Sequence, residues 1–221
     1  MKKIVSLILA ICLSLGTLVL LTGCGAPKDG GPQIKVYLGD EIYDFDPTDY
    51  YADDNAAQLM SLLFEPLFRL DKNGKLECAA AQSYNVDKEN RKIVITLRES
   101  YWSDSVRVKA EDFIYAWRDR IMEPNNANPA AALFYDVEGA VEVKRGDASL
   151  YTFGASASGL YEITIHYREG GDSDTLLANL SSIATSPVRE DLAKSSSSYW
   201  TKQLNTMMTN GPFSIRSMNY E

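Results

Sequence analysis

The chain has 221 residues, of which 45% are hydrophobic and 24% are charged, a composition typical of globular proteins. Its 30 acidic side chains outnumber its 22 basic ones, which argues against a nucleic-acid partner because a phosphate backbone requires a basic surface. The single histidine, His166, excludes sites built from several imidazoles.

The first 23 residues differ from the rest of the chain. Lys2 and Lys3 precede a charge-free run, residues 4–21, which ends at small residues. This pattern predicts a secretory signal peptide at residues 1–23, although the run is also long enough for an uncleaved membrane span. Removal of the signal leaves 20 basic side chains (22 − 2 = 20) against 30 acidic ones, a net charge of −10. Such a body is not attracted to an anionic bilayer.

The three cysteines have different expected fates. Cys12 leaves with the signal peptide, and Cys24 opens the Gly/Pro-rich residues 24–33, which we expect to form a flexible tether. Cys78 then has no partner for an intrachain disulfide. We expect it to be a small buried hydrophobic residue.

Residues 33–39 alternate like a strand, and the acidic, aromatic residues 40–54 that follow suit no regular element. A helix follows and ends before Pro66. Two hairpins are predicted next, at 66–76 and 82–100. The first takes its left-handed residues from Asn73-Gly74. The helix has Asp53 or Asp54 as its cap and Ala56, Leu59, Met60 and Leu63 as its apolar face, and the second hairpin buries Ile93, Ile95 and Leu97.

An aromatic segment, residues 101–117, lies near the middle of the chain. Val106 and Val108 alternate as in a strand, whereas Phe113, Ala116 and Trp117 have helical spacing. The pattern predicts a turn that leads into a helix over 110–122, stopped by Pro124. We expect the large aromatic side chains, Trp102, Phe113 and Trp117, to be core residues and not a ligand surface.

The second half of the chain contains shorter predicted elements. We expect a loop at 125–131, a helix at 135–147 that Gly146 closes, and a strand at 161–169 with His166 facing outward. The expected elements that follow are a helix near 173–180, an extended stretch to 188, a polar helix or loop at 189–204, and a strand beginning near 209.

No motif for catalysis or metal binding is complete. An outward-facing His166 does not suit a Ser-His-Asp triad, and residues 154–159, GASASG, lack the lysine of a phosphate loop. No pair of carboxylates stands out for glycoside cleavage. We therefore expect no enzyme activity, no catalytic residues, no cofactor and no metal. Five aspartates lack the spacing and central glycine of a calcium loop: Asp44, Asp46, Asp49, Asp53 and Asp54.

The aromatic segment carries a family resemblance. Residues 102–117, WSDSVRVKAEDFIYAW, resemble the segment W-S-D-G-x-P-V-T-A-x-D-F-x-Y-S-W of the family 5 extracellular solute-binding proteins of bacterial ABC importers. Further matches follow in the family's order from about residue 34 to 221. They include DFDP at 44–47, which resembles L-D-P, and TNGPFSI at 209–215, which resembles T-N-G-A-Y-x-L. Residues 21–24, LTGC, resemble a lipoprotein lipobox, which implies lipid attachment at Cys24.

This resemblance implies a fold and a domain division. The fold is mixed α/β and periplasmic-binding-protein-like (class II, family 5 type). Residues 34–64 and 187–221 would form part of domain I, an incomplete first lobe, and residues 65–186 would form an inserted α+β domain II. Family members run more than twice as far, so the resemblance leads us to expect that the closing lobe is missing. We expect either a truncated product or a partner chain that supplies the rest.

The resemblance also implies a function. The protein would bind an oligopeptide or other small solute, deliver it to an importer's permease and ATPase, and stay outside the cytoplasm on a lipid anchor in the cell membrane. In peptide-binding members the backbone after L-D-P pairs with an extended peptide, as in strand addition. Alternatives are a sensory or structural lipoprotein and, less favoured, a secreted hydrolase. The candidate ligand-binding residues are Tyr50, Tyr51, Asp53 and Ala130, the last at a position where the family often has tyrosine.

Three departures from the family pattern fall in the aromatic segment. Ser105 replaces a turn glycine, Arg107 a proline, and Lys109 the threonine that would cap the helix. A lysine side chain cannot accept a hydrogen bond from helix amides, so we expect the helix to begin less firmly, at a cost of about 1 kcal/mol.

Overall fold

The computed structural model describes residues 33–37, 44–49, 54–195 and 200–219. The chain divides into two units, Met1–Tyr37 and Leu38–Glu221. In the first unit, residues 33–37 are exposed and form no strand, so the predicted strand at 33–39 is wrong for its described part. Alternating side chains suit a strand, but a strand also requires a hydrogen-bonded neighbour.

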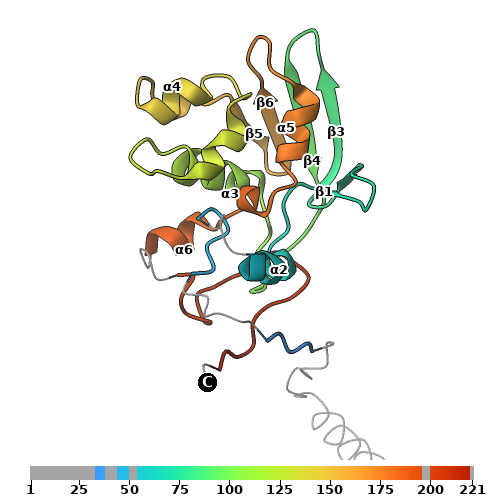
Figure 1. Ribbon diagram of the computed structural model, residues 1–221, viewed down its shortest axis with the longest axis vertical. Helices are drawn as coiled ribbons and strands as arrows, with labels where there is room; N and C mark the ends of the chain where they lie inside the picture. Colours follow the sequence, from blue (N-terminus) through green and yellow to red (C-terminus); the bar gives the residue numbers. More distant parts are fainter. Residues whose placement is uncertain (1–32, 38–43, 50–53, 196–199, 220–221) are drawn as a thin grey trace, which may run out of the picture. The chain divides into compact units, whose positions relative to one another are not determined.

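The second unit contains a four-stranded antiparallel sheet in the order β3-β4-β6-β5 (Figure 1). Ile93 of β4 pairs with Ile165 of β6, and Ile95 with Ile163. All four side chains are fully buried, so they form one apolar face and confirm the predicted alternation of both strands. The strands are β3 (Ala81–Asp87), β4 (Lys92–Leu97), β5 (Ala155–Gly159) and β6 (Glu162–His166).

The sheet tests the predicted strand at 161–169 and also contains residues 154–159. β6 has the expected inward and outward faces, and His166 is exposed at its end. The glycine-containing residues 154–159, rejected above as a phosphate loop, supply the edge strand β5 and its entry. We did not predict β5 from the sequence, because its small residues show no alternation of apolar and polar side chains.

Trp117 lies at the centre of the aromatic core. It is fully buried, and its ring contacts those of Phe113 and Phe134 at centroid distances of 5.9 and 5.4 Å. Its indole N–H donates a 2.8 Å hydrogen bond to the carbonyl of Thr185, so the one polar atom of the ring is satisfied. Phe134 in turn contacts Phe153 at 5.9 Å. The prediction of a structural role for this tryptophan is confirmed.

Trp102 sits at the start of the turn that precedes this helix, and it too is buried. Its indole N–H donates to Asp112 Oδ2 at 3.1 Å. Ser105 in the same turn has a φ of +68°. A left-handed backbone costs a residue with a Cβ about 1–2 kcal/mol, which explains why glycine suits this position in the family pattern.

The predicted helix over 110–122 has two parts. α3 (Ala110–Ile114) follows Lys109, whose backbone N–H donates to Asp112 Oδ2 at 2.9 Å. Half of a capping box therefore remains, and the lysine side chain contributes no acceptor. From Tyr115 to Ile121 the backbone widens into the π-helix η1, which the N–H of Met122 closes on the carbonyl of Trp117 at 2.9 Å. Such wider turns are frequent at functional sites.

The first hairpin, β1 (Phe68–Leu70) and β2 (Leu76–Cys78), corrects two predictions. Cys78 is exposed, so the expectation of a buried cysteine is wrong, because it ends a short strand of a two-stranded sheet. Gly74 has a φ of +77°, but Asn73 is not left-handed. Asp71 shapes the turn instead, since its carboxylate accepts from the N–H groups of Asn73 and Lys75, both at 2.8 Å.

Several shorter helices complete the described part. Gly146, with a φ of +79°, ends α4 as predicted. The loop expected at 125–131 is wrong at its end, because Asn128 and Pro129 begin a 3₁₀-helix there. A 3₁₀ turn also interrupts the stretch expected to be extended before residue 188. The elements are α2 (Asp54–Leu63), η2 (Pro129–Phe134), α4 (Ala140–Arg145), η3 (Leu150–Thr152), α5 (Ser173–Asn179), η4 (Ile183–Thr185) and α6 (Glu190–Ser195).

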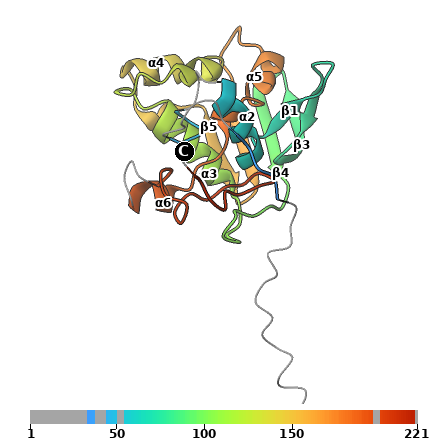
Figure 2. The ribbon, with the colours of Figure 1, turned by 60° about the horizontal axis from the view of Figure 1, so that its bottom comes forward.

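The C-terminal segment, residues 209–219, lies beside α2 (Figure 2). The side-chain amide of Asn210 accepts from the N–H of Glu65 at 3.1 Å and donates to its carbonyl at 2.8 Å. The N–H of Gly211 donates to the carbonyl of Leu63 at 2.9 Å, and a Cβ on Gly211 would lie 2.6 Å from the Leu63 carbonyl carbon. The described residues 209–219 form no strand, so that prediction is wrong: the N–H groups of Gly211 and Phe213 donate to the last residues of α2 instead of to a neighbouring strand.

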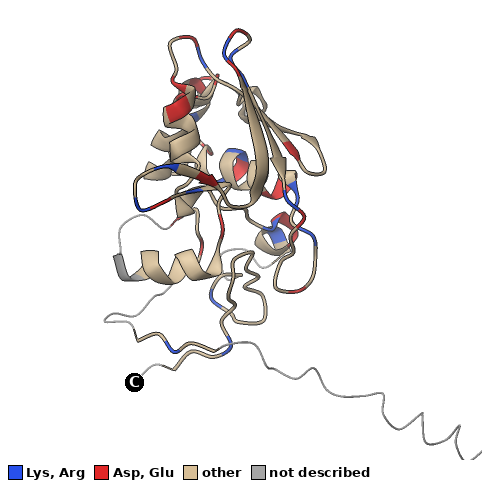
Figure 3. Cartoon of the chain, turned by 90° about the vertical axis from the view of Figure 1, so that its right-hand side faces the viewer, with Lys and Arg blue, Asp and Glu red and all other residues tan. Residues whose placement is uncertain are grey.

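Charged side chains lie mainly on loops and helices, with both signs interspersed (Figure 3). Pairs such as Arg69–Glu77, 3.1 Å apart and well exposed, contribute little to stability. No helix within the described residues has the length and apolar character needed to cross a membrane.

Candidate functional site

The predicted site residues are unevenly covered by the structure. Cys24, Tyr50, Tyr51 and Asp53 lie outside the described residues. Ala130 is described and only 5% exposed, and its N–H donates to Asn128 Oδ1 at 2.9 Å. Its methyl group offers almost no surface for ligand contact. The described approach to the candidate ligand segment is the stretch 44–49, which we call the DFDP loop.

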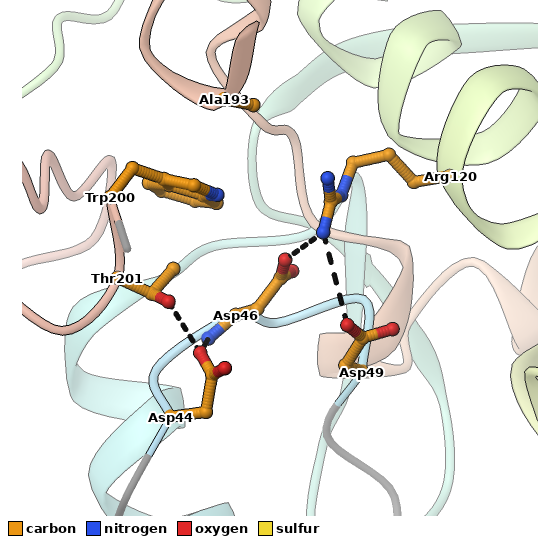
Figure 4. Close-up of a pocket in the computed structure, with 7 residues that line it drawn as sticks. All are labelled: Asp44, Asp46, Asp49, Arg120, Ala193, Trp200 and Thr201. Carbon is orange, nitrogen blue, oxygen red and sulfur yellow. Dashed lines mark hydrogen bonds and ion pairs between the residues drawn. The ribbon is translucent and has the colours of Figure 1, made fainter. Parts of the chain in front are cut away.

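A pocket of about 320 Å³ opens beside the DFDP loop (Figure 4). The loop supplies three carboxylates, η1 supplies a guanidinium, and the chain after α6 supplies an indole ring and a hydroxyl. The lining residues are Asp44, Asp46, Asp49, Arg120, Ala193, Trp200 and Thr201.

The pocket is organised around the ion pair of Asp46 and Arg120. Asp46 is 4% exposed, and its Oδ2 accepts a hydrogen bond from the Arg120 guanidinium. Its Oδ1 accepts from the N–H of Thr48 at 2.9 Å and from the Thr48 hydroxyl at 2.7 Å. Arg120 also donates from Nε to Thr48 Oγ1 at 3.2 Å and lies 3.8 Å from Asp49. The buried carboxylate therefore has the partners that its burial requires.

Burial raises the pKa of the Asp46 carboxyl above its ordinary value, and the Arg120 guanidinium opposes that rise. Burial lowers the pKa of Arg120, but the carboxylates of Asp46 and Asp49 outweigh this effect and raise it overall. The guanidinium therefore stays charged at neutral pH, and it is the principal group that stabilises the ionised form of Asp46.

Asn128 holds the DFDP loop from a second side. Its side chain is buried, and its Nδ2 donates to the carbonyl of Thr48 at 2.6 Å and lies 3.3 Å from Asp49 Oδ1. Its Oδ1 caps η2 through Ala130. The loop is thus bound to two separate elements, η1 and η2.

The opposite wall of the pocket comes from the chain after α6. The hydroxyl of Thr201 donates to Asp44 Oδ1, and Lys202 Nζ lies 3.9 Å from Asp44 Oδ2. Trp200 is buried beside them, and its carbonyl accepts from the Thr206 hydroxyl at 2.9 Å. Figure 4 shows the indole edge directed toward the ion pair.

The arrangement offers polar recognition beside a rigid backbone. In the part of the chain that the structure describes, no three His, Cys, Asp or Glu side chains converge as metal ligands would. The pocket instead presents the half-exposed carboxylates of Asp44 and Asp49, which can accept hydrogen bonds from polar parts of a small solute. The side chains of Asp46, Trp200 and Thr201 are buried in its wall.

Sequence reasoning missed the groups that hold the site. Arg120 carried a signal, because it lies three residues after Trp117 at the end of a predicted core helix and is a natural partner for a buried aspartate. Asn128 was assigned to a loop, and Trp200 and Thr201 to a polar segment. These groups meet the DFDP loop only through tertiary contacts between residues more than 70 positions apart.

Residues 75–221 match the protein family described as "Bacterial extracellular solute-binding proteins, family 5 Middle". The chain belongs to this family. The predictions of family and fold are confirmed. The members of this family are described as bacterial extracellular solute-binding proteins.

Two curated relatives and two solved structures illustrate the similarity. The "Dipeptide-binding protein" of Lactococcus lactis is 30% identical over 167 residues, 74% of this chain and 29% of that protein. The "Dipeptide-binding protein DppE" of Bacillus subtilis is 27% identical over 225 residues, 95% of this chain and 40% of that protein. This chain therefore spans well under half the length of both.

Both structures share the fold. Listeria monocytogenes OppA, solved with a bound peptide, superposes with a TM-score of 0.70 at 24% identity, covering 79% of this chain and 34% of that one. Haemophilus influenzae OppA in complex with RPPGFSPFR gives a TM-score of 0.72 at 24% identity, covering 82% and 35%.

Proposed function

We propose that this protein binds extracytoplasmic oligopeptides and delivers them to the permease and ATPase of an ABC importer. The observation that carries the proposal is the DFDP loop, mounted on η1 and η2 directly before the candidate ligand segment. Two relatives are named as dipeptide-binding proteins and a third as an oligopeptide-binding protein, and those names support a peptide ligand. The candidate contacts are Tyr50, Tyr51 and Asp53, and Ala130 is no longer among them because it is buried.

The proposed domain division assigns residues 34–64 and 187–221 to domain I and 65–186 to domain II. The hydrogen bonds that join Asn210 to Glu65 and Gly211 to Leu63 support it, because they connect distant parts of the chain next to the proposed crossing point at residues 64–65. The four-stranded sheet falls entirely within the proposed domain II. Domain I would carry the DFDP loop.

Peptide binding by the 221-residue chain is expected to be weak. A small-molecule site typically covers about 70–90% of its ligand, whereas the pocket beside the DFDP loop is open on one side. Exposed backbone hydrogen bonds to a peptide compete with water and yield little net free energy. We expect a Kd in the high micromolar range or weaker, which corresponds to a binding free energy on the order of −5 kcal/mol.

Heteronuclear NMR titration of the 15N-labelled chain with tetra-alanine tests this expectation, with free alanine as the control solute. Saturable amide shifts are expected with the peptide only, weakened in Tyr51→Ala and Asp53→Ala. The weak end of the expected range is a Kd of about 1 mM. No amide shift at a peptide concentration about ten times that Kd would contradict peptide binding. A submicromolar Kd would contradict the proposed weakness.

We also propose that the mature protein is held at the membrane by a lipid on Cys24, and that residues 24–33 form the tether. Two or three acyl chains anchor a protein stably, at about 0.8 kcal/mol per buried methylene. In cells, Cys24→Ala is expected to release the protein from the membrane fraction and to abolish the acyl mass increment of the mature N-terminus. Cys12→Ala is the matched control, because Cys12 leaves with the signal. Unchanged membrane retention and mass in Cys24→Ala would contradict the proposal.

A further inference from the structure

We infer that Asn128 is a positioning residue of the ligand site: its side-chain amide fixes the backbone of Thr48 and Asp49, from which the chain enters the candidate peptide-contact segment. This inference rests on the proposed peptide-binding function. It assigns a role to a side chain that sequence reasoning placed in a loop and that does not line the pocket itself.

The orientation of the Asn128 amide is determined by its partners. The N–H of Ala130 can only donate, so the atom it meets at 2.9 Å must be the oxygen Oδ1. The carbonyl of Thr48 can only accept, so the atom 2.6 Å from it must be the nitrogen Nδ2. The same nitrogen lies 3.3 Å from Asp49 Oδ1. One amide therefore joins the start of η2 to the end of the DFDP loop.

The base from which Asn128 acts is rigid. Its own side chain is 3% exposed, and η2 continues into Phe134, which packs against Trp117. Asn179 of α5 donates to the carbonyl of Leu133 in η2 at 3.0 Å. Movement of η2 would disturb the aromatic core, so a group attached to η2 is held in place.

The DFDP loop has a second attachment of a different kind. Arg120 holds the side chains of Asp46 and Thr48 from η1, whereas Asn128 holds the backbone carbonyl of Thr48 from η2. The N–H of Asp49 holds the peptide plane after Thr48 through a 3.3 Å hydrogen bond to the carbonyl of Asp46, and Asn128 adds a shorter bond, 2.6 Å, to the carbonyl on the other side of that plane. Backbone pairing with an extended peptide depends on the direction of such planes, so binding should depend on Asn128 beyond its effect on stability.

Substitutions of Asn128 can remove its hydrogen bond to Thr48 while keeping the one that it accepts from Ala130. In Asn128→Asp the carboxylate still accepts from Ala130 and caps η2, but it repels the carbonyl of Thr48 and the carboxylate of Asp49. In Asn128→Ser the hydroxyl also caps the helix and is too short to reach Thr48. Both variants keep the acceptor that stabilises η2 and lose the donor that positions the loop.

The experiment measures thermal unfolding and tetra-alanine binding by NMR titration in the wild type, Asn128→Asp and Asn128→Ser. The control is Asn90→Ser, in an exposed turn where Asn90 donates only to Asp87. Binding is measured well below the melting temperature of every variant. We expect both Asn128 variants to remain folded and to bind about fivefold more weakly, the effect of one lost hydrogen bond, while Asn90→Ser binds as the wild type does.

Wild-type affinity in either folded Asn128 variant would overturn the inference and leave the proposed function intact. Absence of binding by the wild type would overturn both. If Asn128→Asp does not fold, Asn128→Ser decides, because it introduces no charge.

Discussion

Replacement of Trp117 by alanine is expected to lower the free energy of unfolding by about 3–5 kcal/mol, the usual cost of truncating a large buried aromatic residue. The side chain is fully buried and contacts the rings of Phe113 and Phe134. Alanine would leave a cavity between these rings. It would also leave the carbonyl of Thr185 without the indole donor that now lies 2.8 Å away, which adds a desolvation cost.

Urea unfolding followed by circular dichroism measures this effect. Tyr151→Ala is a suitable control, because Tyr151 is aromatic but 83% exposed and should lose little stability. Trp117→Phe removes the indole donor and part of the ring but keeps a buried aromatic group, so it is expected to cost less than Trp117→Ala. A loss below about 1 kcal/mol for Trp117→Ala, the usual range of a surface change, would contradict the assigned core role.

The second large effect is expected from Arg120→Met, which keeps much of the side-chain volume and removes the charge. Asp46 would remain buried without its cation, and breaking such a pair costs roughly 3 kcal/mol. This figure is at the low end for buried pairs, because the Arg120 side chain is 24% exposed and Thr48 still donates to Asp46. Arg69→Met, which breaks an exposed pair with Glu77, should cost far less.

The loss in Arg120→Met should depend on pH. Burial holds the pKa of Asp46 above its ordinary value of 3.8, and Arg120 is the largest opposing influence. Between the ordinary and the raised pKa, the folded state keeps a proton that the unfolded state has released, so stability falls as pH rises through this window. Removal of Arg120 extends the window upward.

Unfolding at several pH values provides the test. The difference between the wild type and Arg120→Met is expected to be largest at neutral pH and to shrink as the pH approaches the ordinary range of an aspartate. A difference that stays constant, or that grows toward acid pH, would mean that Asp46 is not the group left unpaired. The Arg69→Met control should show no such convergence.

The sequence predicted elements best where one residue pattern decides them locally. The buried faces of β4 and β6, the apolar face of α2 and the end of α4 at Gly146 all follow from side-chain spacing or from a left-handed glycine. Prediction from the sequence failed where pairing with a neighbouring segment decides the structure. Residues 33–37 and 209–219 alternate as strands do but form none in the described structure, and Cys78 is exposed because its hairpin has only two strands.

The candidate site shows the same division. By itself the sequence determined the family, through collinear motifs confirmed over residues 75–221, and the core role of Trp102 and Trp117. Only the tertiary structure decided that Arg120 and Asn128 meet the DFDP loop, across sequence separations of 74 and 80 residues. Side-chain spacing reports burial against a nearby surface, whereas a hydrogen bond between distant segments depends on how separately formed elements pack. That packing has no local signature in the chain.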